Sequence, residues 1–124
     1  MGDARWQAAF GDRPAAIIHS YSGPVDYGRA VIGLGLAVSF SGLVFRAGEE
    51  ASAEVAALVP ADRLLVETDS PFLAPPGAPR SRNEPEWVRV TAGWVAERRG
   101  TTLEALGDEL VVAYDRSVPG QATR

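Results

Sequence analysis

The sequence predicts an α/β fold in which about three parallel strands are flanked by helices. Three short apolar runs alternate with helical segments along the chain, a pattern typical of strand–helix units around a parallel sheet. The runs are continuously apolar, as expected for strands that are buried on both faces. Each run ends in polar residues, and parallel α/β folds carry their chemistry at the carboxyl ends of strands.

Local punctuation assigns the expected elements in chain order. A Ser-Gly-Pro break follows the first apolar run, Gly33 or Gly35 ends the first helix, and Pro60 closes the second. The expected elements are strands at residues 15–18, 36–40 and 63–67, helices at 25–32 and 49–58, and two further helices that begin near residues 84 and 101. Residues 1–14 add a short helical face around Trp6.

The segment at residues 71–85 is expected to be a loop. It contains five prolines, which exclude regular structure over much of its length. The segment follows the polar end of the third strand directly. A functional lid and a plain surface excursion are both compatible with that position.

Two helices are expected to close the chain. Asn83 is expected to cap the first, with Glu84 and Pro85 in its first turn. Thr101 and Glu104 have the spacing of a capping box for the second. The residues expected to face the core are Trp87, Val88, Thr91, Trp94 and Val95 in the first helix, and Leu103, Leu106, Leu110 and Tyr114 in the second. The tail at residues 119–124 is expected to fray.

Composition limits the classes of protein that this chain can be. With 124 residues and 46% hydrophobic residues, the chain suits one domain over residues 1–124. The net charge of −4 excludes a global basic field for nucleic acid, and the absence of Cys excludes disulfides and thiolate metal sites. No apolar run approaches the roughly 18–20 residues that span a bilayer, and no signal peptide opens the chain. We therefore expect a cytoplasmic protein with no membrane partner.

The polar residues at the strand ends are the candidates for chemistry. His19 is the only histidine, and a lone histidine is as compatible with a structural role as with metal binding. Glu67 and Asp69 share a face if the chain stays extended as far as Asp69, although an Asp before Ser-Pro is also a common turn element. Arg80 and Arg82 suit either phosphate binding or ordinary solvation.

Taken together, four stretches of the chain carry a specific resemblance. "IIHSYSG", "VSFSG", "DRLLVETDSPFLAP" and "RNEPEWV" resemble the C-terminal part of the TatD family of metal-dependent hydrolases. The corresponding pieces of that family read like H-C-F-S-G, I-S-F-S-G, D-R-L-L-x-E-T-D-x-P-x-L and R-N-E-P. The resemblance extends over residues 14–116, and the pairing of E-T-D-S-P with R-N-E-P is highly specific.

The resemblance implies the C-terminal part of a TIM (β/α)8 barrel with one or two divalent ions at its C-terminal face. It implies metal-dependent DNase activity, with 3′-to-5′ exonuclease action, on DNA or another phosphodiester. His19 and Asp69 match metal ligands, and Asp69 is also expected to orient or deprotonate the attacking water. The supporting positions that match family motifs are Glu67, Arg82, Asn83 and Glu84. Of these, Glu84 is expected to be a buried partner that pins the loop, and Arg82 to meet phosphate. The ion is Mg, Mn or Zn, since imidazole and carboxylate suit all three.

The chain also departs from the family pattern. The family's H-x-H pair, its middle-strand Glu and a further His have no counterpart here, because the sequence holds one histidine. In the final helix, Ala113 stands where the family has Asn, and Ser117-Val118 replace Leu-Phe. A metal held by two protein ligands binds weakly, so little or no hydrolase activity is expected from this chain alone.

Two other functions stay open at this point. Open edges of a partial barrel would favour a non-catalytic half-barrel module that dimerises or pairs with another half. A metal-dependent hydrolase acting on another ester or amide is the third reading, because the proline-rich segment does not identify the substrate.

Overall fold

The structure is a computed structural model that describes Arg5, Ala9 and residues 11–118. Most of the expected N-terminal helical face and the expected frayed tail at 119–124 therefore lie outside the described residues. The elements in chain order are β1 (Ile17–Ile18), α2 (Val25–Gly33), β2 (Ala37–Phe40), a 3₁₀ helix at Gly42–Phe45, α3 (Ser52–Leu58), a 3₁₀ helix at Ala61–Arg63, β3 (Leu64–Val66), 3₁₀ helices at Pro79–Ser81 and Pro85–Trp87, α4 (Val88–Arg98) and α5 (Leu103–Ser117).

The three strands form one parallel sheet, as the sequence predicts, and their order in the sheet is β1-β2-β3. Ile18 is in register with Val38, and Phe40 with Val66. All four residues of β2 are buried, which confirms that the central strand is covered on both faces. Ile17 in the short outer strand β1 is 40% exposed. The outer strands β1 and β3 each have one neighbour in the described chain, so the sheet has two free edges.

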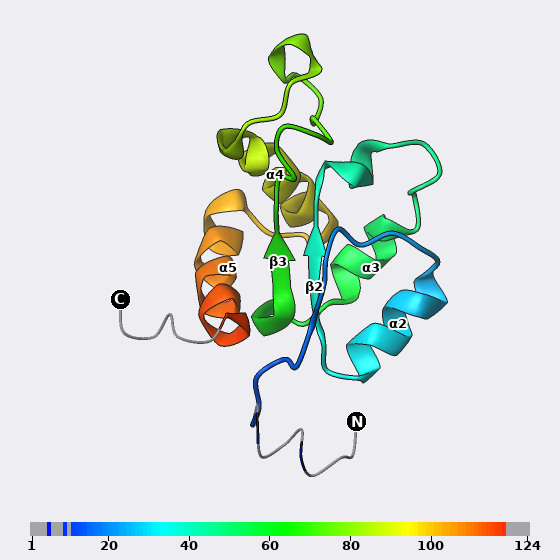
Figure 1. Cartoon of the computed structure of the whole chain (residues 1–124), viewed down its shortest axis with the longest axis vertical. Coiled ribbons are helices and arrows are strands. Elements are labelled where there is room, and N and C mark those ends of the chain that lie inside the picture. Colours follow the sequence, from blue (N-terminus) through cyan, green and yellow to red (C-terminus); the bar gives the residue numbers. More distant parts are fainter. Residues whose placement is uncertain (1–4, 6–8, 10, 119–124) are drawn as a thin grey trace.

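Helices cover the sheet on one side and at its flanks. Figure 1 shows α2 and α3 beside β2, α5 beside β3, and α4 behind the strands. The main core joins Val38 and Phe40 of β2 and Leu64 of β3 to Val55 of α3 and Val95 of α4. A smaller cluster joins Ala37, Leu65 and Ala113. No helix in the described part of the chain is long and apolar enough to cross a membrane.

The ends of α2 follow the local sequence closely. Gly35 adopts a positive φ of 76°, its N–H donates to the carbonyl of Ile32, and the N–H of Leu36 donates to the carbonyl of Val31. This is the Schellman arrangement, which satisfies the last carbonyls of a helix. Before α2, the hydroxyl of the buried Tyr21 donates to the carbonyl of Pro24 over 2.7 Å, and burial raises the pKa of this phenol.

Several expected boundaries are wrong by a few residues. Residues 49–51 lie outside α3, and Arg63 lies in the 3₁₀ helix before β3. The side chain of Thr102, and not Thr101, caps α5 by accepting a hydrogen bond from the N–H of Ala105. Helix caps depend on the backbone angles of a single residue, which the spacing of a motif does not fix.

The predicted core face of α5 is only half right. Leu106 is fully buried and Leu110 packs against the core, as expected. Leu103 and Tyr114 are 47% and 42% exposed, respectively. The face that carries Tyr114 lies beside the free edge of β3, where a groove is also lined by Val66. The apolar pattern of this helix is therefore wider than the surface that the described chain covers.

Candidate functional site

The candidate site lies where the three strands end. His19 and Ser20 follow β1, Ser41 follows β2, and Glu67 follows β3. Because the strands are parallel, these residues lie together at the carboxyl ends of the strands, as the sequence predicts. The hydroxyls of Ser20 and Ser41 lie 2.5 Å apart and join the first two strand ends.

Glu67 ties the first strand end to the third. The N–H of Ser20 donates to Oε2 of Glu67 over 3.0 Å, and Nδ1 of His19 lies 2.6 Å from Oε1. Oε1 is shielded from solvent and accepts no hydrogen bond from the described residues, so its approach to Nδ1 is a close ion-pair contact. The Glu67 side chain is 17% exposed, whereas the imidazole of His19 is 68% exposed. The carboxylate is therefore the buried anchor, and the imidazole is the accessible group.

This contact favours Nε2 over Nδ1 as the nitrogen of His19 that can bind a ligand. A carboxylate accepts a hydrogen bond from the protonated nitrogen of an imidazole, which leaves the other nitrogen with its lone pair. With Nδ1 engaged by Glu67, Nε2 is the nitrogen free to bind a ligand. Histidines that ligate metals typically donate their second N–H to a carboxylate in this way. The arrangement fits the role that the resemblance assigns to Glu67, namely support of the site.

Asp69 lies in a strained turn and not on the strand. β3 ends at Val66, and Asp69 has a positive φ of 59°. The condition for Glu67 and Asp69 to share a face is therefore not met. Ser20 and Leu73 also have positive φ, at 49° and 54°. Non-glycine residues with positive φ store strain and are concentrated at functional sites.

Asn83 holds this strained turn together. The side chain is 3% exposed, and its Nδ2 lies 2.6 Å from the carbonyl oxygen of Thr68, 2.8 Å from that of Phe72 and 3.4 Å from that of Leu73. The helix at Pro85–Trp87 begins after Glu84 with no side-chain cap. The prediction that Asn83 caps a helix is therefore wrong, because the side chain satisfies buried carbonyls of the preceding loop instead.

The two charged neighbours of Asn83 are solvent-facing. Arg82 and Glu84 are both exposed and line an open hollow with Ser70 and Pro71. The expectation of Glu84 as a buried partner that pins the loop is wrong, because Asn83 fills that role. Arg82 remains a candidate for phosphate binding at this surface.

The described residues do not make up a complete metal centre. No group of three or more His, Asp or Glu side chains within residues 11–118 has the geometry to hold an ion. His19 and Asp69 supply two donors of the type that Mg, Mn or Zn accept. Catalytic sites for these ions use three or more protein ligands, so the donor set of the described chain is incomplete.

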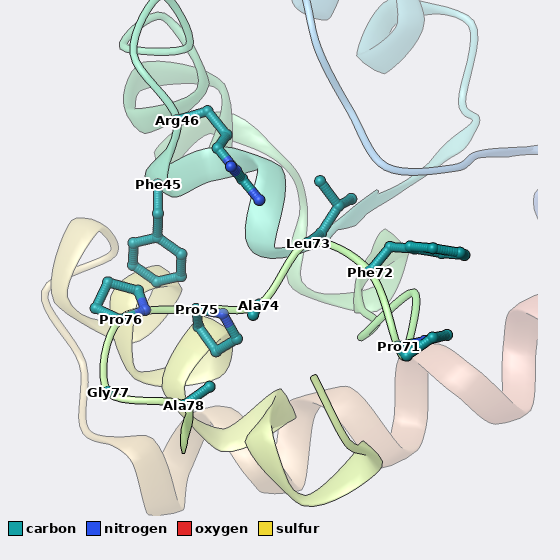
Figure 2. A pocket seen from close by; sticks show the side chains of 10 residues that line it. All are labelled: Phe45, Arg46, Pro71, Phe72, Leu73, Ala74, Pro75, Pro76, Gly77 and Ala78. Atoms are coloured by element: carbon teal, nitrogen blue, oxygen red, sulfur yellow. The ribbon is translucent and has the colours of Figure 1, made fainter. Parts of the chain in front are cut away.

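Sequence reasoning missed a second feature beside the site. Figure 2 shows a hollow between Arg46, which follows the 3₁₀ helix at Gly42–Phe45, and the proline-rich segment after Asp69. Its lining residues are Phe45, Arg46, Pro71, Phe72, Leu73, Ala74, Pro75, Pro76, Gly77 and Ala78. The proline content marked the segment as a possible lid, but nothing local in the sequence linked it to Arg46, about thirty residues earlier.

The profile of the TatD-related DNase family matches residues 4–116. The chain belongs to this family. Over 90 residues the chain is 38% identical to the uncharacterized metal-dependent hydrolase YcfH of Escherichia coli, covering 73% of this chain and 34% of that protein. Over 100 residues it is 40% identical to the 3′-5′ ssDNA/RNA exonuclease TatD of Erwinia billingiae, covering 76% of this chain and 38% of that protein.

Solved structures of TatD proteins share the fold. The crystal structure of a TatD family hydrolase from Entamoeba histolytica matches with a TM-score of 0.71 at 15% identity, covering 94% of this chain and 46% of that one. The TatD homologue YJJV of Escherichia coli matches with a TM-score of 0.70 at 22% identity, covering 80% of this chain and 38% of that one. This TatD chain therefore spans less than half the length of each of these four relatives.

Proposed function

We propose that this chain is the C-terminal part of a TatD-type TIM barrel that hydrolyses phosphodiester bonds, with DNA as the substrate, in a metal-dependent reaction. The contact that carries the proposal is the 2.6 Å approach of His19 Nδ1 to Glu67 Oε1. It leaves Nε2 available as a donor, and Asp69 follows Glu67 by two residues, in a turn where its φ is 59°. The name of the Erwinia billingiae relative, a 3′-5′ ssDNA/RNA exonuclease, supports a nucleic-acid substrate.

The residues of this chain have distinct tasks in the proposed reaction. A divalent ion at such a site supplies a bound water of lowered pKa and neutralises charge that develops on the phosphoryl group. His19 and Asp69 would hold the ion, and the Asp69 carboxylate would take a proton from the attacking water. Glu67 would fix the imidazole, and Asn83 would fix the turn that carries Asp69. Arg82 would meet a phosphate of the substrate.

Two donors set the expected level of activity. Since the described residues offer no third ligand, we expect weak ion binding and little or no DNA cleavage by the 124-residue chain. The first test is Mn²⁺ titration followed by NMR of the His19 ring protons, which are unambiguous because His19 is the only histidine. Broadening of these signals that Asp69→Asn weakens and Asp108→Asn leaves unchanged would support the proposal.

The second test is cleavage of single-stranded DNA with added Mg²⁺ or Mn²⁺. Robust turnover that a chelator stops and Asp69→Asn abolishes would overturn the expectation of an inactive chain while supporting the hydrolase. Mn²⁺ that broadens no His19 signal at millimolar concentration would count against His19 as a ligand and against the proposed site.

A specific observation also favours the second candidate, a module that associates through its open edge. Leu65 and Val66 of β3 line a groove of about 230 Å³ with Leu110, Val111 and Tyr114 of α5. The Val111 side chain is 60% exposed. An unpaired strand edge flanked by apolar side chains favours pairing with another chain.

The size of the protein in solution separates this candidate from a monomer. Sedimentation measures this size directly for three proteins: the wild type, Val111→Glu, and the matched surface variant Ala30→Glu on α2. Association that Val111→Glu abolishes and Ala30→Glu preserves would support the module. A monomer at every concentration would exclude self-association and leave only pairing with a different half.

A further inference from the structure

The hollow of Figure 2 combines an aromatic and a cationic group close to the candidate site. It measures about 660 Å³ and is bounded by Phe45 and Arg46 on one side and by residues 71–78 on the other. The lining segment begins two residues after Asp69, the proposed metal ligand. The hollow therefore adjoins, along the chain, the turn that carries Asp69.

Phe72 presents an open aromatic ring on a fixed backbone. The side chain is 69% exposed, more than any other large apolar side chain in the described part of the chain. Its N–H donates to the carbonyl of Asp69 over 2.8 Å, and its carbonyl accepts from Asn83 over 2.8 Å. Figure 2 shows the ring extending away from Pro75 and Pro76 at the Pro71 end of the hollow. An exposed ring held from both sides of its backbone can stack against a flat partner at little further entropic cost.

Arg46 supplies the positive charge. It is exposed and makes no ion pair with the described residues, in a chain whose net charge is −4. Its guanidinium points toward the backbone near Leu73 (Figure 2). A guanidinium without a carboxylate partner suits a phosphate, because its planar fork matches two phosphate oxygens.

The backbone segments that carry the two groups pack against each other. A Cβ at Gly42 would overlap the carbonyl oxygen of Leu73, so the proline-rich segment rests directly on the 3₁₀ helix that precedes Arg46. Leu73 has a positive φ of 54° at this contact. This contact therefore positions the backbones that carry Phe72 and Arg46, while both side chains stay exposed.

We propose that Phe72 and Arg46 form a subsite for single-stranded nucleic acid, in which Phe72 stacks on a base and Arg46 binds a backbone phosphate. The inference rests on the proposed function and names two residues that would hold its substrate. A base in a duplex is already stacked on both faces, whereas an unpaired base has a face free for an aromatic side chain. The subsite therefore selects single strands, and it does so without reading the sequence.

The test measures binding without catalysis. Fluorescence anisotropy in EDTA compares a labelled oligothymidylate with an abasic oligomer of the same length, on the 124-residue chain. The wild type is expected to bind the oligothymidylate more tightly than the abasic oligomer. Phe72→Ala is expected to weaken only oligothymidylate binding, by roughly 5- to 150-fold for one stacked base, and Phe72→Trp to retain it. Leu103→Ala, at an exposed apolar position on α5, is the matched control and should leave the affinity for both oligomers unchanged.

Arg46 is tested by its salt dependence. Arg46→Gln is expected to weaken the binding of both oligomers. It should also reduce the slope of log Kd against log salt by about 0.7, the value for one phosphate contact on a single strand. Arg29→Gln on α2, which removes an exposed ion pair with Glu54, should leave that slope unchanged.

Three binding results would overturn the subsite. They are equal affinity of the wild type for the two oligomers, no binding of either oligomer, and an equal effect of Phe72→Ala on the binding of both oligomers. A change in sedimentation of the free protein on Phe72→Ala would assign the ring to an interface between copies, which also overturns it. Because EDTA removes the ion, failure here leaves the Mn²⁺ titration of His19 as a separate test of the proposed function.

Discussion

Glu67 makes a close charged contact with His19, the single histidine of the sequence. Oε1 approaches His19 Nδ1 at 2.6 Å, while Oε2 is held by the N–H of Ser20 at 3.0 Å. Only Oε2 accepts a hydrogen bond, and the carboxylate cannot turn away from the imidazole without leaving the N–H of Ser20 unpaired. We predict that the nearby Oε1 sets the tautomer of His19.

Glu67→Gln is expected to reverse that tautomer. If the amide oxygen keeps the bond to Ser20, its NH₂ group faces Nδ1, which must then accept, so the proton moves to Nε2. Affinity for Mn²⁺ or Zn²⁺ should fall about 10- to 100-fold, the usual effect of losing a carboxylate behind a ligating histidine. The ¹⁵N chemical shifts of His19 at alkaline pH report the tautomer directly, with exposed Glu104→Gln as control. An unchanged ¹⁵N pattern would show that Glu67 does not fix the proton.

Asn83 is the residue whose loss should loosen the site most. Asn83→Ala leaves the carbonyls of Thr68 and Phe72 without a buried donor, which we expect to cost roughly 1–3 kcal/mol of unfolding free energy. Asn83→Asp keeps the shape but turns an acceptor toward those carbonyls, so it should cost more. Urea unfolding measures both, and the exposed neighbour Glu84→Ala should stay within about 0.5 kcal/mol of wild type. An equal cost for Glu84→Ala would remove the special role of Asn83.

At the scale of elements, the sequence predicts what local chemistry controls. The predicted helix at 25–32 and the observed α2 at Val25–Gly33 agree because Pro24 and Gly35 act on their own backbones. The parallel direction of the strands was also predictable, since a helix lies between each pair of apolar runs. The role of Asn83 was not predictable from spacing, because its partner Thr68 lies 15 residues away. The incomplete donor set, by contrast, follows from counting histidines in the sequence.

Arg99 joins α4 to α3 by hydrogen bonds. Like those of Asn83, these bonds form between residues far apart in the sequence. From the end of α4 its Nη1 donates to the carbonyls of Ala56 and Val59, at 2.9 and 2.6 Å. These oxygens lie at the end of α3, where the last helical carbonyls lack partners.

Arg99→Ala is expected to lower the unfolding free energy by about 1.5–3 kcal/mol, as for other hydrogen bonds from charged donors. Arg29→Ala, which removes the exposed ion pair with Glu54, should cost no more than about 1 kcal/mol. Chemical unfolding of the two variants compares the half-buried hydrogen bonds of Arg99 with the solvated ion pair of Arg29. Equal losses of unfolding free energy would mean that the hydrogen bonds of Arg99 to α3 add no more stability than a surface ion pair.

At the scale of the whole molecule, the free edge of β3 is the surface that the fold leaves unfinished. The chain spans 34% and 38% of the lengths of two curated relatives. In the described part of the chain, β3 pairs only with β2. The groove along its other edge is lined by Val111 and Tyr114, both exposed. A partner that adds a strand there would bury apolar side chains and pair free backbone groups at the same time.

Two adjacent amides can report whether that edge is used. The N–H of Glu67 donates to the carbonyl of Phe40 over 2.9 Å, whereas the N–H of Val66 points to the opposite edge because successive amides of a strand alternate. In a monomer, Glu67 should therefore show a higher hydrogen-exchange protection factor than Val66. Strand addition at this edge should raise protection of Val66 as protein concentration rises and leave Glu67 nearly unchanged. Val111→Glu should keep Val66 in fast exchange. Protection of Val66 that stays low while sedimentation shows a dimer would mean that the copies meet at another surface and that the β3 edge stays open.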